Sequence, residues 1–183
     1  MKKKPVILSV LAHPDDESFG MGGTLALYAE QGAEVHLVCA TRGEVGEMDE
    51  KYMQGFDSIA DRRESELRCA AGILGLAGVY FLDYRDSGMP GSADNEHPRA
   101  LFAQPVNEVA ENVVCYIRDL KPDIVLTFDP IGGYRHPDHI AIHDATVIAF
   151  DRADDPIFAP NAGETYKPRK LYYHTFSSAF LRV

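Results

Sequence analysis

The sequence is poor in basic residues. Lysine and arginine number 18 against 28 aspartates and glutamates, so the 183 residues carry a formal net charge of -10 and have an isoelectric point of about 5.1. A protein that binds nucleic acid or an anionic membrane surface needs a basic face to neutralise phosphate groups. We therefore expect neither nucleic acid nor a membrane among the partners of this chain.

Paired cysteines and long apolar runs are also lacking. The three cysteines, Cys39, Cys69 and Cys115, form no Cys-x-x-Cys pair, and an odd number of isolated thiols is more typical of a reducing compartment than of a secreted disulfide scaffold. No apolar stretch is long enough to span a bilayer. Pro5 and a short apolar run follow the basic start, which excludes the hydrophobic region of a signal peptide. The expected location is the cytoplasm.

The known nucleotide-binding loops are absent as well. Gly20, Gly22 and Gly23 follow the first apolar run, but they match neither the G-x-x-x-x-G-K-[ST] pattern nor the G-x-G-x-x-G pattern of a first strand-to-helix turn. A nucleotide cofactor therefore has little support.

What is present is an alternation of apolar runs with amphipathic segments, which is typical of βαβ units and a parallel sheet. We expect strands at 6–11, 34–39, 79–82, 124–128 and 171–176, and helices at 24–31, 58–74, 105–120 and 138–150. A hydrophobic content of 45% and this length suit one domain. The prediction is a single α/β domain over residues 1–183, Rossmann-like, with a mostly parallel sheet, helices on both faces and the active site at the carboxyl ends of the strands.

Two polar clusters lie close behind predicted strands. Ala12-His13-Pro14-Asp15-Asp16-Glu17 comes after the first, and His136-Pro137-Asp138-His139 comes shortly after the fourth. Carboxyl ends of parallel strands lie at one edge of the sheet, as do the long segments 43–56 and 86–99, which match no regular element. We expect the two clusters to meet there.

Metal chemistry explains the composition of these clusters. With His13, Asp16 and His139 as ligands, two imidazoles and one carboxylate would leave an open position for water, which is the composition of a catalytic zinc centre. The same ligands also suit Fe²⁺. Asp15 would then be free to act as the general base toward the attacking water.

His136 would complete the chemistry. If Asp138 holds and charges it, the imidazole would polarise the substrate carbonyl, stabilise the oxyanion and protonate the departing amine. Other interpretations remain open: Asp15 or Ser18 would cap the helix that follows. His143, four residues after His139, would lie on the same helix face as a further ligand or a packing residue.

The paired motifs resemble those of the LmbE-like, or PIG-L, family of zinc-dependent N-acetylglucosaminyl deacetylases. Further matches are the segment 41–47, Arg63 to Leu67 as R-x-x-E-L, and the segment 85–89, so the resemblance extends over nearly the whole chain. The last three segments bring it nearest to the mycothiol-pathway deacetylase and conjugate-amidase branch.

This resemblance implies roles for the clustered residues. His13, Asp16 and His139 would hold zinc, and Asp15 would be the base. His136, oriented by Asp138, would support the oxyanion.

The resemblance adds residues that the composition alone does not single out. It implies sugar contacts from Glu47, Arg63 and Asp86, and a mobile Tyr134 that hydrogen-bonds the tetrahedral intermediate. By itself, Arg63 is equally well interpreted as half of a surface ion pair.

The chain also departs from the family pattern. Gly20 stands where the mycothiol deacetylase pattern has a serine, so one substrate contact is expected to be missing. Family members commonly continue for some tens of residues beyond the position of Val183. The resemblance therefore leads us to expect a form that is truncated at the C-terminus.

The leading hypothesis is a zinc-dependent hydrolase that removes the acetyl group from an N-acetylglucosamine-containing conjugate through a metal-bound hydroxide. The alternatives are an amidase that cleaves a sugar-thiol conjugate, a non-catalytic metal- or sugar-binding module, and an Fe²⁺ oxygenase that uses the same ligands. The sequence leaves the oligomeric state open, a homo-oligomer included.

Overall fold

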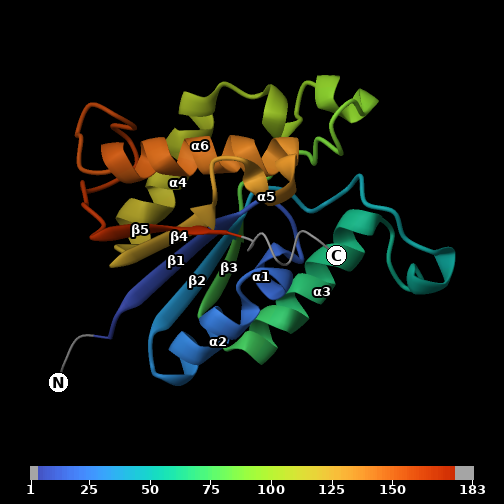
Figure 1. Cartoon of the computed structure of the whole chain (residues 1–183), viewed down its shortest axis with the longest axis horizontal. Coiled ribbons are helices and arrows are strands. Elements are labelled where there is room, and N and C mark those ends of the chain that lie inside the picture. The colour runs from blue at the N-terminus through green and yellow to red at the C-terminus, as the bar shows by residue number, and fades with distance from the viewer. Residues whose placement is uncertain (1–3, 176–183) are drawn as a thin grey trace.

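A computed structural model describes residues 4–175 and contains one sheet of five strands (Figure 1). The strands lie in the order β3-β2-β1-β4-β5, and every pairing between neighbours is parallel. Their bounds are β1 Val6–Leu11, β2 Glu34–Cys39, β3 Gly78–Phe81, β4 Ile124–Phe128 and β5 Lys170–His174. The predicted Rossmann-like α/β fold is confirmed.

Helices cover both faces of the sheet. α4, α5 and α6 lie on one face, whereas α1, α2 and α3 lie on the other (Figure 1). Their bounds are α1 Asp16–Phe19, α2 Gly22–Glu30, α3 Ile59–Leu74, α4 Val106–Leu120, α5 Gly132–Arg135 and α6 Pro137–Arg152. None of the helices within residues 4–175 combines the length and apolar character needed to cross a bilayer.

Local sequence signals account for most of these boundaries. All six residues of β1 are buried, as expected for a central parallel strand that is covered on both faces. α3 begins after Ser58, whose hydroxyl accepts a hydrogen bond from the backbone N–H of Asp61 (3.1 Å). It ends at Gly75, which adopts a φ of 75° that favours glycine after a helix.

The structure adds helical turns that the hydrophobic pattern did not indicate. The first motif itself forms α1, so the predicted helix at 24–31 is preceded by one turn and begins at Gly22. The two long segments contain only short 3₁₀ turns, at Glu50–Tyr52 and Ala93–Glu96. Phe176, the last residue of the predicted final strand, lies outside the described residues.

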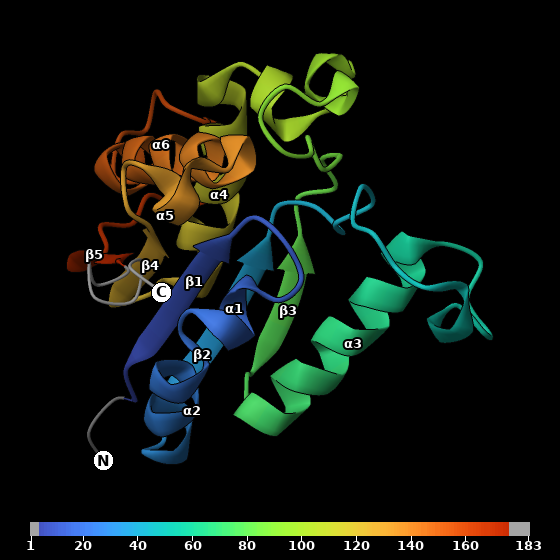
Figure 2. The ribbon, with the colours of Figure 1, turned by 45° about the vertical axis from the view of Figure 1, so that its right-hand side comes forward.

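The position of the site follows from the strand order. From β1 the chain adds β2 and β3 on one side of the sheet, and then β4 and β5 on the other. A crevice forms at the carboxyl ends where the order reverses, here between β1 and β4. Figure 2 shows the arrowheads of β1, β2 and β3 pointing toward the edge from which the long connecting segments leave.

One buried arginine joins α4 to the segment that follows α6. Arg118 is 2% exposed, and its guanidinium donates hydrogen bonds to the backbone carbonyls of Ala153 (3.0 Å), Ala159 (2.6 Å), Asp155 (2.8 Å) and Phe158 (2.8 Å). A buried charge is tolerated only where such partners satisfy its donors. Arg118 therefore fixes the path of the chain between α6 and β5.

We expect Arg118→Met to lower the free energy of unfolding by about 3 kcal/mol or more, because several buried carbonyls lose a charged donor at once. Urea denaturation followed by circular dichroism measures this loss. Arg152→Met is the control, since Arg152 pairs with Asp155 at the surface (2.8 Å) and its loss should cost less than about 1 kcal/mol. Equal losses in the two variants would contradict the role of Arg118.

Candidate metal centre

The first motif is a strained turn. Asp15 has a φ of 126°, a backbone conformation that residues other than glycine rarely adopt. Its backbone N–H donates to Oε2 of Glu17 (3.0 Å), a carboxylate that is only 1% exposed. Within residues 4–175, Asp15 makes no side-chain capping bond to α1, so the capping interpretation is wrong for this residue. The strain instead separates two adjacent carboxylates, those of Asp15 and Asp16.

The predicted metal ligands form a triangle of side chains, in which Asp16 presents one carboxylate oxygen to each imidazole. His13 Nδ1 lies 3.6 Å from Asp16 Oδ2 and 3.3 Å from His139 Nε2, and His139 Nε2 lies 3.3 Å from Asp16 Oδ1. Ligands at about 2.1 Å from a tetrahedral zinc ion are separated by roughly 3.4 Å. The residues present therefore fit a divalent metal held by two imidazoles and one carboxylate.

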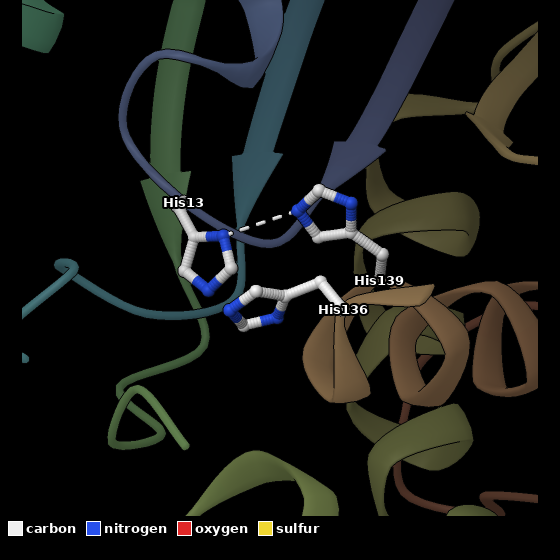
Figure 3. A group of neighbouring side chains, drawn as sticks. All are labelled: His13, His136 and His139. Carbon is white, nitrogen blue, oxygen red and sulfur yellow. Dashed lines mark hydrogen bonds between the residues drawn. The ribbon is translucent and has the colours of Figure 1, made fainter. Parts of the chain in front are cut away.

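His136 offers a second way to complete the triad. The rings of His13, His136 and His139 converge (Figure 3), and ligand atoms of all three lie within 4.8 Å of one another. His136, however, uses Nδ1 as the N-cap of α6, where it accepts the backbone N–H of Asp138 (3.2 Å). Asp16 therefore stays the predicted third ligand, and His136 lies beside the predicted metal position.

Hydrogen bonds fix the orientation of both ligating imidazoles. His139 Nδ1 donates to the carbonyl of Gly132 (3.3 Å), and the ring stacks on Phe128 with 3.9 Å between centroids. His13 Nε2 donates to Oδ2 of Asp138 (3.1 Å). Each bond leaves the opposite ring nitrogen, Nδ1 of His13 and Nε2 of His139, with a free lone pair that faces the triangle. This is the usual arrangement around a ligating histidine.

Asp138 differs from its predicted position. Its carboxylate was expected on His136, but it accepts hydrogen bonds from His13 and from the backbone N–H (2.9 Å) and hydroxyl of Ser87. The physical reason is that the start of α6 engages the Nδ1 atom of His136. Sequence reasoning missed Ser87, whose only signal is its place in the segment 85–89 that resembles the family pattern.

The surroundings of His136 oppose the positive charge expected of it. Burial, with the nearby imidazoles of His13 and His139, lowers the pKa of His136 to about 4. Because Nδ1 accepts a hydrogen bond, the neutral ring carries its proton on Nε2. In its neutral state His136 is therefore a hydrogen-bond donor through Nε2.

Negative charge dominates the triangle itself. Burial alone would lower the pKa of His13, but hydrogen bonds to Asp138, Asp16 and Asp86 raise it well above its usual value. Burial alone would raise the pKa of Asp16, but hydrogen bonds to His13 and His139 hold it well below its usual range. An ionised carboxylate and an environment that favours cations both suit a metal ion.

Asp15 has different electrostatics from its neighbour. Burial and the charge of Asp16 raise its pKa, although Arg63 opposes the shift. Arg63 Nη2 lies 2.9 Å from Asp15 Oδ2 and 2.6 Å from the carbonyl of Pro14, and Nη1 donates to Gly43 (3.0 Å). Arg63 therefore ties the segment after β2 to the strained turn, which is more than a surface ion pair does.

All but one of the predicted site residues line two cavities that share Asp15 and Tyr134. The polar cavity, about 420 Å³, is lined by the predicted residues His13, Asp15, Glu47, Arg63, Asp86, Tyr134 and His136. The Gly20 cavity, about 190 Å³, is lined by Asp15, Asp16, Phe19, Gly20, Phe128, Tyr134, His139 and His174. Asp138 is fully buried behind them. The structure thus brings the predicted residues together, whereas their roles stay predictions.

Supporting contacts explain how the walls of the polar cavity are held. The backbone N–H of Asp86 donates to Glu44 (3.0 Å), and its Oδ1 accepts the N–H of Gly88 (2.8 Å) while lying 3.6 Å from His13 Nε2. His143 has another function, because its Nδ1 donates to the carbonyl of Phe128 (2.7 Å) in the core. This contact favours the packing interpretation of His143.

Comparison with known proteins finds relatives that are named deacetylases. A deacetylase for 1D-myo-inositol 2-acetamido-2-deoxy-alpha-D-glucopyranoside from Geodermatophilus obscurus is 38% identical over 96% of this chain and 63% of its own length. The protein of the same name from Streptomyces scabiei is 41% identical over 92% of this chain and 55% of its own length. The chain thus spans between 55 and 63% of the length of these two relatives.

Solved structures share the fold. The N,N'-diacetylchitobiose deacetylase from Pyrococcus horikoshii superposes with a TM-score of 0.74 at 29% identity, covering 92% of this chain and 60% of that one. The 4-carboxy-2-hydroxymuconate hydratase GalB from Pseudomonas putida gives a TM-score of 0.66 at 26% identity, covering 90% and 63%. The family profile described as PIG-L, GlcNAc-PI de-N-acetylase, matches residues 8–150. Since this match includes both motifs and the strands that carry them, the chain belongs to the PIG-L family.

Proposed function

We propose that this chain is a zinc-dependent N-deacetylase that hydrolyses the acetamido group of an N-acetylglucosamine-containing conjugate. The observation that carries the proposal is the triangle of His13, Asp16 and His139 at the junction of two cavities. The named activities of the two bacterial relatives support the choice of an acetylated amino sugar.

A divalent metal in this triangle would supply a water of lowered pKa and an electrophile for the amide carbonyl. Two imidazoles and a carboxylate favour zinc, although the same set accepts Fe²⁺. The remaining chemistry belongs to side chains of the chain itself.

Asp15 is the proposed general base. Its carboxylate adjoins Asp16 along the chain and lines both cavities, so a proton taken from the attacking water has a nearby acceptor. Burial and the charge of Asp16 raise its pKa, which strengthens it as a base. The protonated Asp15 then returns that proton to the departing amine, a step that a neutral His136 does not perform.

His136 and Tyr134 are the proposed donors to the oxyanion. The Nε2–H of a neutral imidazole donates a hydrogen bond without adding a positive charge beside the metal position. Tyr134 is 54% exposed, and its ring lies edge-on to His139 with 5.1 Å between centroids. An exposed tyrosine at the junction of the cavities is free to rotate toward the intermediate. Asp138 acts through His13 by fixing the ring that bears the ligand atom.

Glu47, Arg63 and Asp86 are proposed to bind the sugar. All three line the polar cavity, where carboxylates accept hydrogen bonds from hydroxyl groups and a guanidinium donates them. A neutral sugar is not opposed by the acidic surface. The similarity to a hydratase means that the fold alone does not fix the reaction, and product analysis distinguishes deacetylation from cleavage elsewhere in a conjugate by the release of acetate.

Metal content tests the ligand set. Elemental mass spectrometry should find about one zinc per chain in the parent and in Asp15→Asn, and little in His13→Ala, because only the last change removes a ligand. His143→Gln is the matched control: its histidine bonds to Phe128 and should not affect the metal. Iron in the parent would favour the oxygenase hypothesis, and full retention in His13→Ala would refute the triangle.

The rate of acetate release tests the base. Asp15→Asn should lower kcat by roughly 10²-fold or more while metal content is unchanged, because an amide cannot accept the proton. N-Acetylglucosamine conjugates serve as substrates, with acetate and free amine both quantified. Rates within a factor of a few of the parent would exclude Asp15 as the base.

Ser87 should control metal affinity through Asp138. Ser87→Ala removes the hydroxyl that holds the carboxylate on His13, so we expect metal affinity to fall by roughly 10- to 100-fold, the usual effect of an outer-shell partner. Competition with a chelator measures the affinity directly. Ser92→Ala, in the same long segment, is the control, since its hydroxyl bonds to Asp94 (3.2 Å for the N–H). An unchanged metal affinity in Ser87→Ala would contradict this role of Ser87, because other contacts would then orient His13.

A further inference from the structure

The two cavities that meet at Asp15 and Tyr134 differ in size, about 420 Å³ for the polar cavity and about 190 Å³ for the Gly20 cavity. The polar cavity presents the charged groups of Glu47, Arg63 and Asp86. The Gly20 cavity is lined by the predicted ligands Asp16 and His139, by Phe19, Gly20 and Phe128, and by His174. An amide that reacts at the metal position has two substituents, and each needs a cavity of its own.

A side chain at position 20 would meet a neighbouring side chain, although the backbone there suits any residue. Gly20 has a φ of -97° and a ψ of -47°, which any residue adopts. A methyl group on Gly20 would nevertheless lie 2.6 Å from Cε1 and 3.0 Å from Nδ1 of His174, closer than side chains approach. The imidazole of His174 thus occupies the space that a side chain at position 20 would take.

His174 reaches this place from the edge of the sheet. It is the last residue of β5, paired in register with Phe128 at the end of β4. Phe128 in turn stacks on the ligand His139. The half-buried imidazole of His174 therefore forms a wall of the Gly20 cavity next to the metal position.

We propose that the Gly20 cavity receives the acyl group of the substrate and that His174 limits the length of the acyl chain. This inference rests on the proposed amide hydrolysis. The larger polar cavity has room and charged partners for a hydroxyl-rich sugar, and the smaller Gly20 cavity, with the buried ring of Phe128 in its wall, suits a short hydrocarbon. The substrate class is then an amino sugar with a short N-acyl chain, acetyl in preference to butyryl, and His174 is a specificity-determining residue.

Selectivity between acyl chains is the primary test. His174→Ala removes the wall, so the ratio of kcat/KM for N-butyrylglucosamine to that for N-acetylglucosamine should rise by about tenfold or more, the effect expected of extra methylene groups in an apolar pocket. A change of less than twofold would overturn the assignment.

Gly20→Ala tests the position of the His174 ring independently. The added methyl group must displace the His174 ring, so this change should alter the selectivity ratio at least threefold in the parent and less than twofold in the His174→Ala background. Gly23→Ala is the matched control, because a methyl group there meets no atom within 4 Å. Equal effects of Gly20→Ala in both backgrounds would show that His174 is not the contact.

A spectroscopic measurement separates this inference from the proposed function. In Asp15→Asn protein, the histidine Cε1–H signal that is lost in His174→Ala should shift more with N-butyrylglucosamine than with N-acetylglucosamine. If it does while the parent hydrolyses neither sugar, the hydrolase proposal fails and the acyl cavity stands. If the parent releases acetate but the signal responds equally to both sugars or to neither, the acyl assignment fails. No response and no turnover would refute both.

Discussion

The hydrogen bond between His13 Nε2 and Asp138 is the interaction on which the site depends. It joins the turn after β1 to the start of α6, two segments that are 125 residues apart. The bond fixes the ring that presents Nδ1 to Asp16 and His139, so one buried contact sets both the distance between the segments and the orientation of a ligand. Ser87 extends this network to the long segment after β3. Displacement of any of these segments would therefore change the orientation of His13 at the predicted metal position.

Adjacent carboxylates serve different purposes because the backbone forces them apart. The φ of 126° at Asp15 is held by the buried carboxylate of Glu17 and by Arg63. A relaxed turn would not need these partners. These contacts offset the energetic cost of the strained backbone. Such strain is typical of functional sites. Asp16 has a depressed pKa and remains ionised among imidazoles, whereas burial raises the pKa of Asp15.

The division of the site between two cavities follows from the fold. The polar cavity is built by α3 and by segments that leave β1, β2, β3 and β4, and the Gly20 cavity by segments around β1, β4 and β5. All the predicted site residues fall within residues 8–150, the part that matches the PIG-L profile. His174 lies beyond that part. The proposed acyl side of the site therefore includes one residue outside the matched part.

The sequence by itself determined the parallel α/β fold, because apolar runs and helix signals such as Ser58 and Gly75 are local. It also indicated the site, since two His-Asp motifs at the ends of strands meet in any sheet of this topology. Tertiary structure decided what each polar atom contacts. Asp138 bonds to His13 because the N-cap of α6 occupies Nδ1 of His136, and His174 covers Gly20 because β5 pairs beside β4. Such contacts depend on distances between segments remote in the chain, which no local pattern encodes.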